Sequence, residues 1–394
     1  MSSSPPQTEL KKTLSFQDLL FFGIASILGS GGFNLVGEAI AKGGDYWPVS
    51  LASAAALFYG SSKTYETAFE SSKQNTAESD FVRSIFGDAA ANLTTTAILA
   101  FNILSISTIL VLCSHMLFPK GTWTGQILFA LFLLGGMGIF SLKGLVLNKE
   151  LINSFMVLLI LFLTLIAGLG VSGLFRNGTV VSEGGASNRP SFVLSLLFFY
   201  FILAGFDALI KFTEEAKDKK DIPRSFYWSN FISFLLVLGL SFAIVSFVDL
   251  KQVKNYDNIV GELVNSFLGH SSDEIIKYLT VLFMLVTTFV AFLATTRYLF
   301  SFSEDFQSLK IFTELNEKQA PVNSIYATTG IAGLGILMNH TETLVRICDF
   351  SLSTQLLLVA AAAAFKQVKD GKIPWLESAT TAGFAGLMGL SCMK

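Results

Sequence analysis

The chain has 394 residues, of which 52% are hydrophobic and only 14% are charged, whereas soluble domains average about 25% charged residues; the composition excludes an ordinary soluble domain. The net charge of −2 excludes the basic surface of a nucleic-acid-binding protein, so no nucleic-acid partner is expected. The spacing of the three cysteines suits neither a disulfide framework nor a metal site; they are Cys113, Cys348 and Cys392.

The first 14 residues, Met1 to Leu14, are rich in Ser, Pro and Lys and have no apolar core. They predict a disordered cytosolic tail and not a cleavable signal peptide. No loop in the rest of the chain is long enough to form a separate soluble domain. Residues 15–394 are therefore expected to form one transmembrane domain.

Eleven segments are long and apolar enough to cross a membrane, which takes about 20 residues. In chain order they are Asp18–Ala41, Trp47–Thr67, Asp88–Phe118, Thr122–Leu142, Glu150–Phe175, Ser191–Phe212, Ser225–Val248, Ile275–Phe302, Val322–Met338, Thr343–Ala364 and Leu376–Cys392. The sequence thus predicts an all-α polytopic membrane protein with about 11 transmembrane helices.

The basic residues indicate how these helices are oriented. With the N-terminus inside, 18 of the 27 Lys and Arg residues fall on the cytoplasmic side and 9 on the outer side. This bias satisfies the positive-inside rule. We expect a multi-pass protein, most simply of the plasma membrane, with a cytoplasmic N-terminus.

Two of the predicted helices are interrupted by glycine in mid-segment. The first break is Gly29-Ser30-Gly31-Gly32, and the second is Gly205-Phe206-Asp207. Such breaks free backbone groups that lipid cannot satisfy, so they must face protein or a water-filled cavity. Paired breaks in two halves of a chain indicate the binding site of a transporter.

The positions of the breaks fit a five-plus-five inverted repeat, because each broken helix would open one repeat. The first repeat would cover residues from about 18 to 175, and the second from about 191 to 364. One extra helix, about 376–392, would follow.

Three stretches of the chain carry recognisable motifs. Residues 21–33, FFGIASILGSGGF, resemble G-x-x-I-G-S-G-I-F, the first-helix signature of the amino acid–polyamine–organocation family. Residues 205–224, GFDALIKFTEEAKDKKDIPR, are similar to its G-F-D-x(6)-E-E-x-K-N-P-x-x-x-I-P-R motif. The eighth helix ends in Arg297-Tyr298-Leu299-Phe300, similar to the family's R-x-x-Y/F. Together the matches extend over helices 1 to 10.

The resemblance implies a leucine-transporter-type fold, in which discontinuous helices 1 and 6 face each other at the membrane midplane. It implies secondary transport of amino acids or related small amines by alternating access. The dipole of a half-helix beginning near Gly31 attracts a carboxylate, and freed carbonyls near Leu203 can accept from an ammonium group. The substrate-binding residues expected on this basis are Gly29, Ser30, Gly31, Gly32, Leu203, Gly205, Phe206 and Asp207.

Other interpretations of these residues stay open at this point. The glycines of the first break also suit close helix packing. Asp207 is suited to cap the second half of helix 6 or to contact a cationic group, and the two roles are compatible. Glu214 and Glu215, beside several lysines, form either a solvated charged face or a gating salt bridge.

The sequence also departs from the family. Gly32 replaces an apolar residue, and Ile202 and Leu203 stand where a small residue and an aromatic ring are common. The middle of helix 5 lacks the lysine of many proton-coupled relatives, and hydroxyls of helix 8, such as Thr287 and Thr288, are candidates for a sodium site. The coupling ion is therefore expected to be H⁺ or Na⁺, with no other cofactor.

These departures also support a second hypothesis, a transporter-derived protein that does not transport and acts as an amino-acid sensor or a structural membrane component. An enzyme is not expected, because no metal cluster, nucleotide motif or catalytic triad is recognisable. The expected partners are a small-molecule substrate and the lipid bilayer, and no protein partner is indicated.

Overall fold

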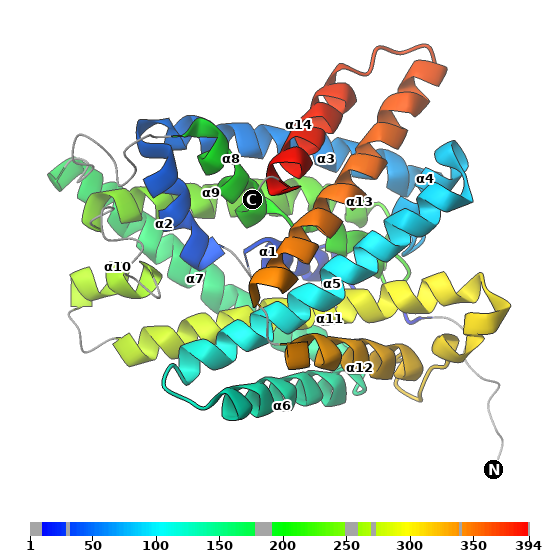
Figure 1. The fold of residues 1–394 in the computed structure, drawn as a ribbon, viewed down its shortest axis with the longest axis horizontal. Helices are drawn as coiled ribbons and strands as arrows, with labels where there is room; N and C mark the ends of the chain where they lie inside the picture. The colour runs from blue at the N-terminus through cyan, green and yellow to red at the C-terminus, as the bar shows by residue number, and fades with distance from the viewer. Residues whose placement is uncertain are drawn as a thin grey trace.

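The computed structural model describes residues 10–28, 32–177, 191–248, 259–268, 273–338 and 341–392. These residues form a bundle of helices (Figure 1), with two isolated β-bridges and no longer strand among them. The helices are α1 (Phe16–Leu28), α2 (Gly32–Gly43), η1 (Gly44–Tyr46), α3 (Trp47–Ser72), α4 (Ala77–Phe86), α5 (Asp88–Leu117), α6 (Trp123–Ser141), α7 (Leu145–Asn177), α8 (Phe192–Leu203), η2 (Phe206–Phe212), α9 (Asp221–Phe247), α10 (Ile259–Leu268), α11 (Asp273–Glu304), η5 (Gln307–Thr313), α12 (Val322–Met338), α13 (Thr341–Lys369) and α14 (Trp375–Cys392).

Each of the eleven segments predicted to span the membrane is helical over most of its described residues, with an interruption at Ala204 and Gly205 in the sixth. In the described part of the chain, seven helical segments are long and apolar enough to cross a membrane on length and composition alone. They are α5, α6, α7, α8 with η2, α9, α11 and α13. The other four predicted spans are the broken pair α1 and α2, then α3, α12 and α14. Of these, α1 has 13 residues and α12 has 17.

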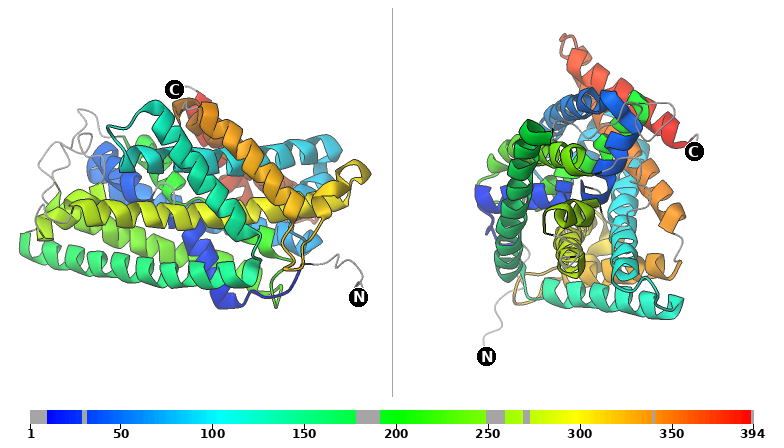
Figure 2. Two further views of the ribbon diagram at one scale, coloured as in Figure 1. Left: turned by 90° about the horizontal axis from the view of Figure 1, so that it is seen from below. Right: turned by 90° about the vertical axis from the view of Figure 1, so that its left-hand side faces the viewer.

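The outer helices present apolar side chains away from the protein. In both views of Figure 2, α7 lies at the edge of the bundle. Its Leu165 is 65% exposed and its Phe175 is 89% exposed, while Phe132 of α6 is 73% exposed. Large apolar side chains facing outward along a whole helix require an apolar surrounding. The bundle is therefore built to be solvated by lipid.

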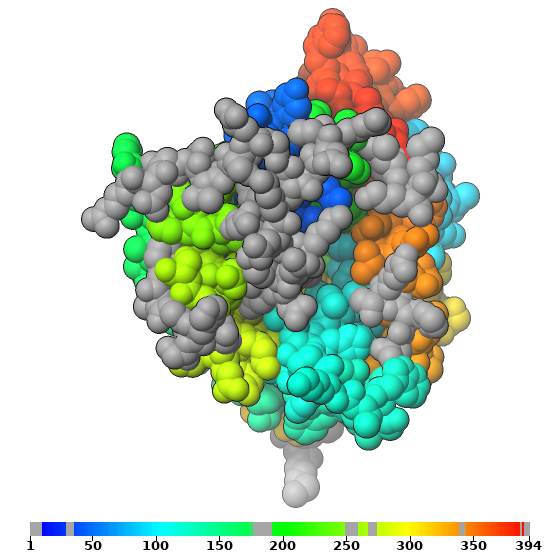
Figure 3. Space-filling model, turned by 60° about the vertical axis from the view of Figure 1, so that its left-hand side comes forward, coloured from blue at the N-terminus to red at the C-terminus, as the bar shows by residue number. Residues whose placement is uncertain are grey.

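Two short helices, α4 and α10, lie between predicted spans, where the sequence analysis predicts no helix. They occupy equivalent places in the two repeats, since α4 follows the second predicted span and α10 follows the seventh. Figure 1 shows them at opposite ends of the bundle. Figure 3 shows the surface at the α10 end. This opposed placement is what an inverted repeat requires.

Residues 10–14 of the tail that was expected to be disordered belong to the described part of the chain and make specific contacts, whereas residues 1–9 lie outside it. The amides of Thr13 and Leu14 donate to the carbonyl of Glu215 at 2.9 and 3.0 Å, and the amide of Lys217 donates to Leu14 at 2.8 Å. Leu14 is fully buried. Composition could not reveal this, because the partners lie about 200 residues away in sequence.

We expect deletion of residues 1–14 to expose the segment after η2, residues 213–220, to protease. Burial of a leucine side chain alone stabilises by about 1.5–3 kcal/mol, so tryptic cleavage at Lys217 to Arg224 should accelerate at least about tenfold. Mass spectrometry of timed digests in detergent measures the rate. Deletion of residues 1–9 is the control, since it spares the bonded residues; equal cleavage in both variants would contradict the assignment.

Candidate functional site

The first and sixth predicted spans are each divided into two helices. The first ends as α1 at Leu28 and resumes as α2 at Gly32. The sixth ends as α8 at Leu203 and resumes as η2 at Phe206. Of the first predicted break, Gly29, Ser30 and Gly31 lie outside the described residues, and their binding roles stay predictions. Gly32 is the first residue of α2, at the half-helix N-terminus where a carboxylate was expected to bind.

The second break lies directly against the end of α1. Gly205 has a φ of +125°, a conformation that side chains other than hydrogen rarely allow. A Cβ at this position would lie 2.8 Å from the carbonyl carbon of Ser26 and closer still to its oxygen. Backbone therefore meets backbone at this point, and the two broken helices face each other as the resemblance implied.

Aromatic rings surround the second break. Phe206 is fully buried, and its ring centroid lies 5.2 Å from that of Tyr65, 5.6 Å from Phe226 and 6.0 Å from Phe58. Tyr200 stacks on Phe58 at 5.1 Å. Sequence reasoning missed this aromatic layer, because its rings come from α3, α8, η2 and α9, and no local pattern joins them.

Three hydroxyl groups in this region are buried without a hydrogen-bond partner in the described part of the chain. They belong to Ser26 at the end of α1, Tyr65 of α3 and Tyr200 of α8. A buried polar group left unpaired costs about 1–3 kcal/mol, and native proteins rarely leave one without water or a ligand. The hydroxyls therefore mark the neighbourhood of the breaks as a place where a small polar molecule can bind.

A buried charge cluster lies just beyond the second break. The ammonium of Lys211 is 2.8 Å from Asp207 Oδ2 and 3.3 Å from Glu78 Oε1. Lys211 and Glu78 are fully buried and Asp207 is nearly so. Asp207 thus binds a cation from its own helix, and among the described residues it makes no capping bond to η2. Lys211 is one of the 18 basic residues counted on the cytoplasmic side, and this assignment is wrong, because its side chain is fully buried inside the bundle.

A second ion pair joins the segment after η2 to α11. Arg297 is fully buried, and its Nε is 3.0 Å from Glu215 Oε2. Beside it, Ser301 donates to Glu214 at 2.9 Å. Burial raises the pKa of Glu214. Of the two interpretations of this acidic pair, the solvated face is wrong, because Glu215 is only 2% exposed; the salt bridge is present.

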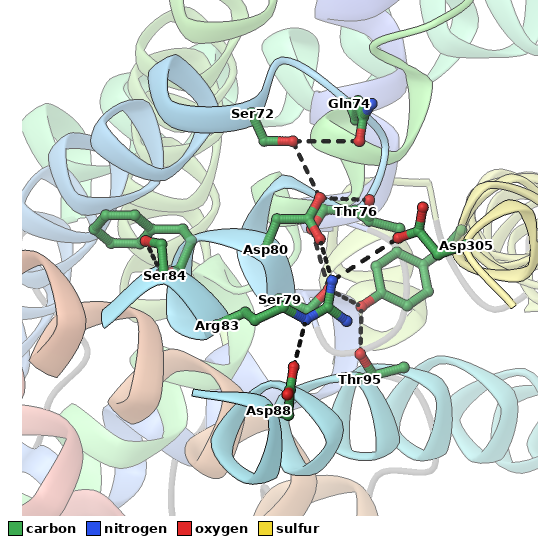
Figure 4. A network of polar contacts seen from close by, with 12 residues as sticks. Ser72, Gln74, Thr76, Ser79, Asp80, Arg83, Ser84, Asp88, Thr95 and Asp305 are labelled. Atoms are coloured by element: carbon green, nitrogen blue, oxygen red, sulfur yellow. Dashed lines mark hydrogen bonds and ion pairs between the residues drawn. The ribbon is translucent and has the colours of Figure 1, made fainter. Parts of the chain in front are cut away.

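The short helix α4 is fixed to its neighbours by a polar network (Figure 4). Arg83 contacts Asp80 at 3.2 Å, Asp88 of α5 at 3.3 Å and Asp305 at 3.8 Å. The hydroxyl of Tyr298, on α11, lies 3.0 Å from that of Ser79. These contacts hold α4 in place and so fix the position of Glu78, which the same helix carries.

The two threonines proposed for a sodium site bond to their own helix. Thr287 and Thr288 each donate to the carbonyl of Met284, at 2.8 and 2.7 Å. This is the back-bonding that threonine commonly makes in membrane helices. The sodium site stays a prediction.

A multi-pass helical protein whose first and sixth spans break opposite each other has the architecture of a leucine-transporter-type membrane transporter. A solved structure that the chain resembles is that of Mhp1, a nucleobase-cation-symport-1 family transporter in a closed conformation with bromovinylhydantoin bound. The TM-score is 0.58 and the identity 13%, with 93% of this chain and 81% of that chain covered. The likeness supports the fold.

The particular family follows from the sequence. The model of the amino acid permease family matches residues 14–392, and the chain therefore belongs to this family. A search of curated proteins finds no significant match. The class of protein is thus a membrane transporter.

Proposed function

We propose that this protein is a secondary transporter of amino acids or related small amines, that it works by alternating access, and that it is not an enzyme. The observation that carries the proposal is the contact of Gly205 with the backbone of Ser26, near three buried hydroxyls that have no hydrogen-bond partner among the described residues. Family membership favours the amino-acid class over the hydantoin bound by the structural neighbour.

An amino-acid zwitterion suits the groups around the breaks. Gly32 begins α2, and the N-terminus of a helix offers amide donors and the positive end of the helix dipole, which stabilise a carboxylate. An ammonium group needs acceptors, and hydroxyl oxygens of Tyr65 and Tyr200 can supply them. The rings of Phe58 and Phe206 provide an apolar wall for the side chain of the substrate.

We place the protein in the plasma membrane with its N-terminus in the cytoplasm. The excess of Lys and Arg on the N-terminal side supports this orientation, and it is still 16 against 9 when the buried Lys211 and Arg297 are left out of the 18. In this orientation, the hydrogen bonds between Leu14 and the segment after η2 lie at the cytoplasmic end of the bundle.

Uptake into proteoliposomes tests the proposal. Labelled amino acids, small amines, a nucleobase and a hydantoin are offered to purified protein, with proton and sodium gradients supplied. We expect uptake of at least one amino acid or amine, and a fall of about tenfold in Tyr65→Phe or Tyr200→Phe if each hydroxyl makes one hydrogen bond worth about 1.4 kcal/mol. Tyr59→Phe, at an exposed tyrosine of α3, is the matched control.

The outcomes separate the hypotheses. Transport of the hydantoin or nucleobase alone would overturn the substrate class. Stabilisation of the protein against heat by an amino acid, without any uptake, would replace the transporter by a sensor.

A further inference from the structure

The cluster of Glu78, Asp207 and Lys211 does not balance its charge. With all three groups ionised, two carboxylates face one ammonium, which leaves a net charge of −1 among side chains that are at most 3% exposed. An uncompensated charge in such surroundings is costly, and proteins relieve it by pairing or by taking up a proton.

The missing proton can be assigned to one atom. The three donors of the Lys211 ammonium have three acceptors: Glu78 Oε1 at 3.3 Å, Asp207 Oδ2 at 2.8 Å and the Asp207 carbonyl at 3.2 Å. Oε2 of Glu78 is buried and receives no hydrogen bond from any described residue. A proton on Oε2 would neutralise the cluster without disturbing the bonds of Lys211.

In the part of the chain that the structure describes, no other ionisable group facing Glu78 supplies a second cation. Tyr65 faces it from α3, Tyr298 from α11, and Asp80 lies on its own helix. Helices α5 and α13 also pack against α4, and their charged side chains contact residues of α4 other than Glu78. Asp88 pairs with Arg83, and the Lys366 ammonium lies over the ring of Phe81.

We propose that Glu78 Oε2 is a proton-binding site and that its proton is the ion coupled to transport, an inference that rests on the proposed function. Asp207 lies two residues after Gly205, so the cluster joins the second helix break to α4. When water reaches α4, Glu78 releases its proton to solvent and becomes a carboxylate. The cluster that joins η2 to α4 then has a net charge of −1. This uncompensated charge favours separation of the two helices.

The acidity of Glu78 is suited to this role. Burial of the side chain raises the pKa of its carboxyl group to about 7, although Lys211 acts in the opposite direction. A carboxyl group with such a pKa exchanges its proton at ordinary pH, whereas an exposed glutamate with a pKa of about 4.3 is already ionised.

Transport by Glu78→Gln, which mimics the protonated side chain, tests the coupling. We expect this variant to exchange labelled for unlabelled substrate at a rate near that of the wild type. Its accumulation of substrate driven by a pH gradient should be at least about tenfold lower than that of the wild type. Glu70→Gln, at an exposed carboxylate of α3, is the control and should accumulate normally. Unchanged accumulation by Glu78→Gln would overturn the inference.

Infrared titration gives a readout that does not depend on transport. In purified wild-type protein we expect the carbonyl band of one protonated carboxyl group to disappear as the pH rises from about 5 to about 9. The band should persist in Glu70→Gln and be absent from Glu78→Gln. If the glutamine variant does not fold, Glu78→Asp should keep the band at a shifted pH. A wild-type spectrum with no such band overturns the proton site, whereas a titrating band without uptake of any substrate counts against the proposed function alone.

Discussion

Replacement of Gly205 by alanine is expected to abolish transport, lowering uptake by more than about a hundredfold, and to reduce the melting temperature in detergent. A side chain at a φ of +125° costs about 1–3 kcal/mol through backbone strain. The new methyl group also collides with the carbonyl of Ser26, which belongs to backbone and cannot turn aside. To relieve the collision, α1 must move away from the break, and the face-to-face arrangement of the two broken helices is lost.

The matched control for this variant is Gly330→Ala in α12. A methyl group at Gly330 meets nothing within 4 Å, and alanine is favoured over glycine in a helix by about 1 kcal/mol. We expect this variant to be as stable as the wild type or slightly more so, with normal uptake. Equal behaviour of the two alanine variants, in melting temperature and in uptake, would show that the contact at Gly205 does not position the helices.

Much of the fold is predictable because it depends on local properties of the chain. The ninth predicted span, Val322–Met338, coincides with α12 residue for residue, since its length and polarity alone define it. The break at Gly205 is also predictable, because this glycine lies in the motif of residues 205–224 that resembles the family's motif. The short helix α4 was missed because one of its faces is charged, which gives a segment the composition of a loop.

The charged residues inside the bundle show where local reasoning ends. Lys211 lies within the predicted span Ser191–Phe212, and Arg297 lies within Ile275–Phe302, so both carry the signal of a functional charge in a membrane. Their positions near the ends of the spans made an interfacial location equally consistent. What decides between these alternatives is the partner, and Glu78 lies 133 residues from Lys211 in sequence. The unpaired hydroxyls are likewise a property of packing and not of sequence.

Replacement of Arg297 by methionine is expected to cause the largest loss of stability among single changes outside the helix breaks. The guanidinium is fully buried, and its removal leaves the carboxylate of Glu215 without a counter-ion. Loss of one partner of a buried ion pair typically destabilises by about 3–5 kcal/mol. Melting temperature and the yield of monodisperse protein measure the effect.

Two further variants distinguish the effect of losing the ion pair from the effect of changing the size of the side chain. The double variant Arg297→Met with Glu215→Gln removes both charges, and we expect it to recover most of the lost stability, because a neutral pair has no buried charge to compensate. Lys63→Met breaks a pair whose lysine is 47% exposed, and exposed pairs contribute only about 0–1 kcal/mol. If the double variant is no more stable than Arg297→Met, the arginine acts through its packing and its bond to Thr296 at 3.0 Å, and the ion pair does not hold the segment after η2 against α11.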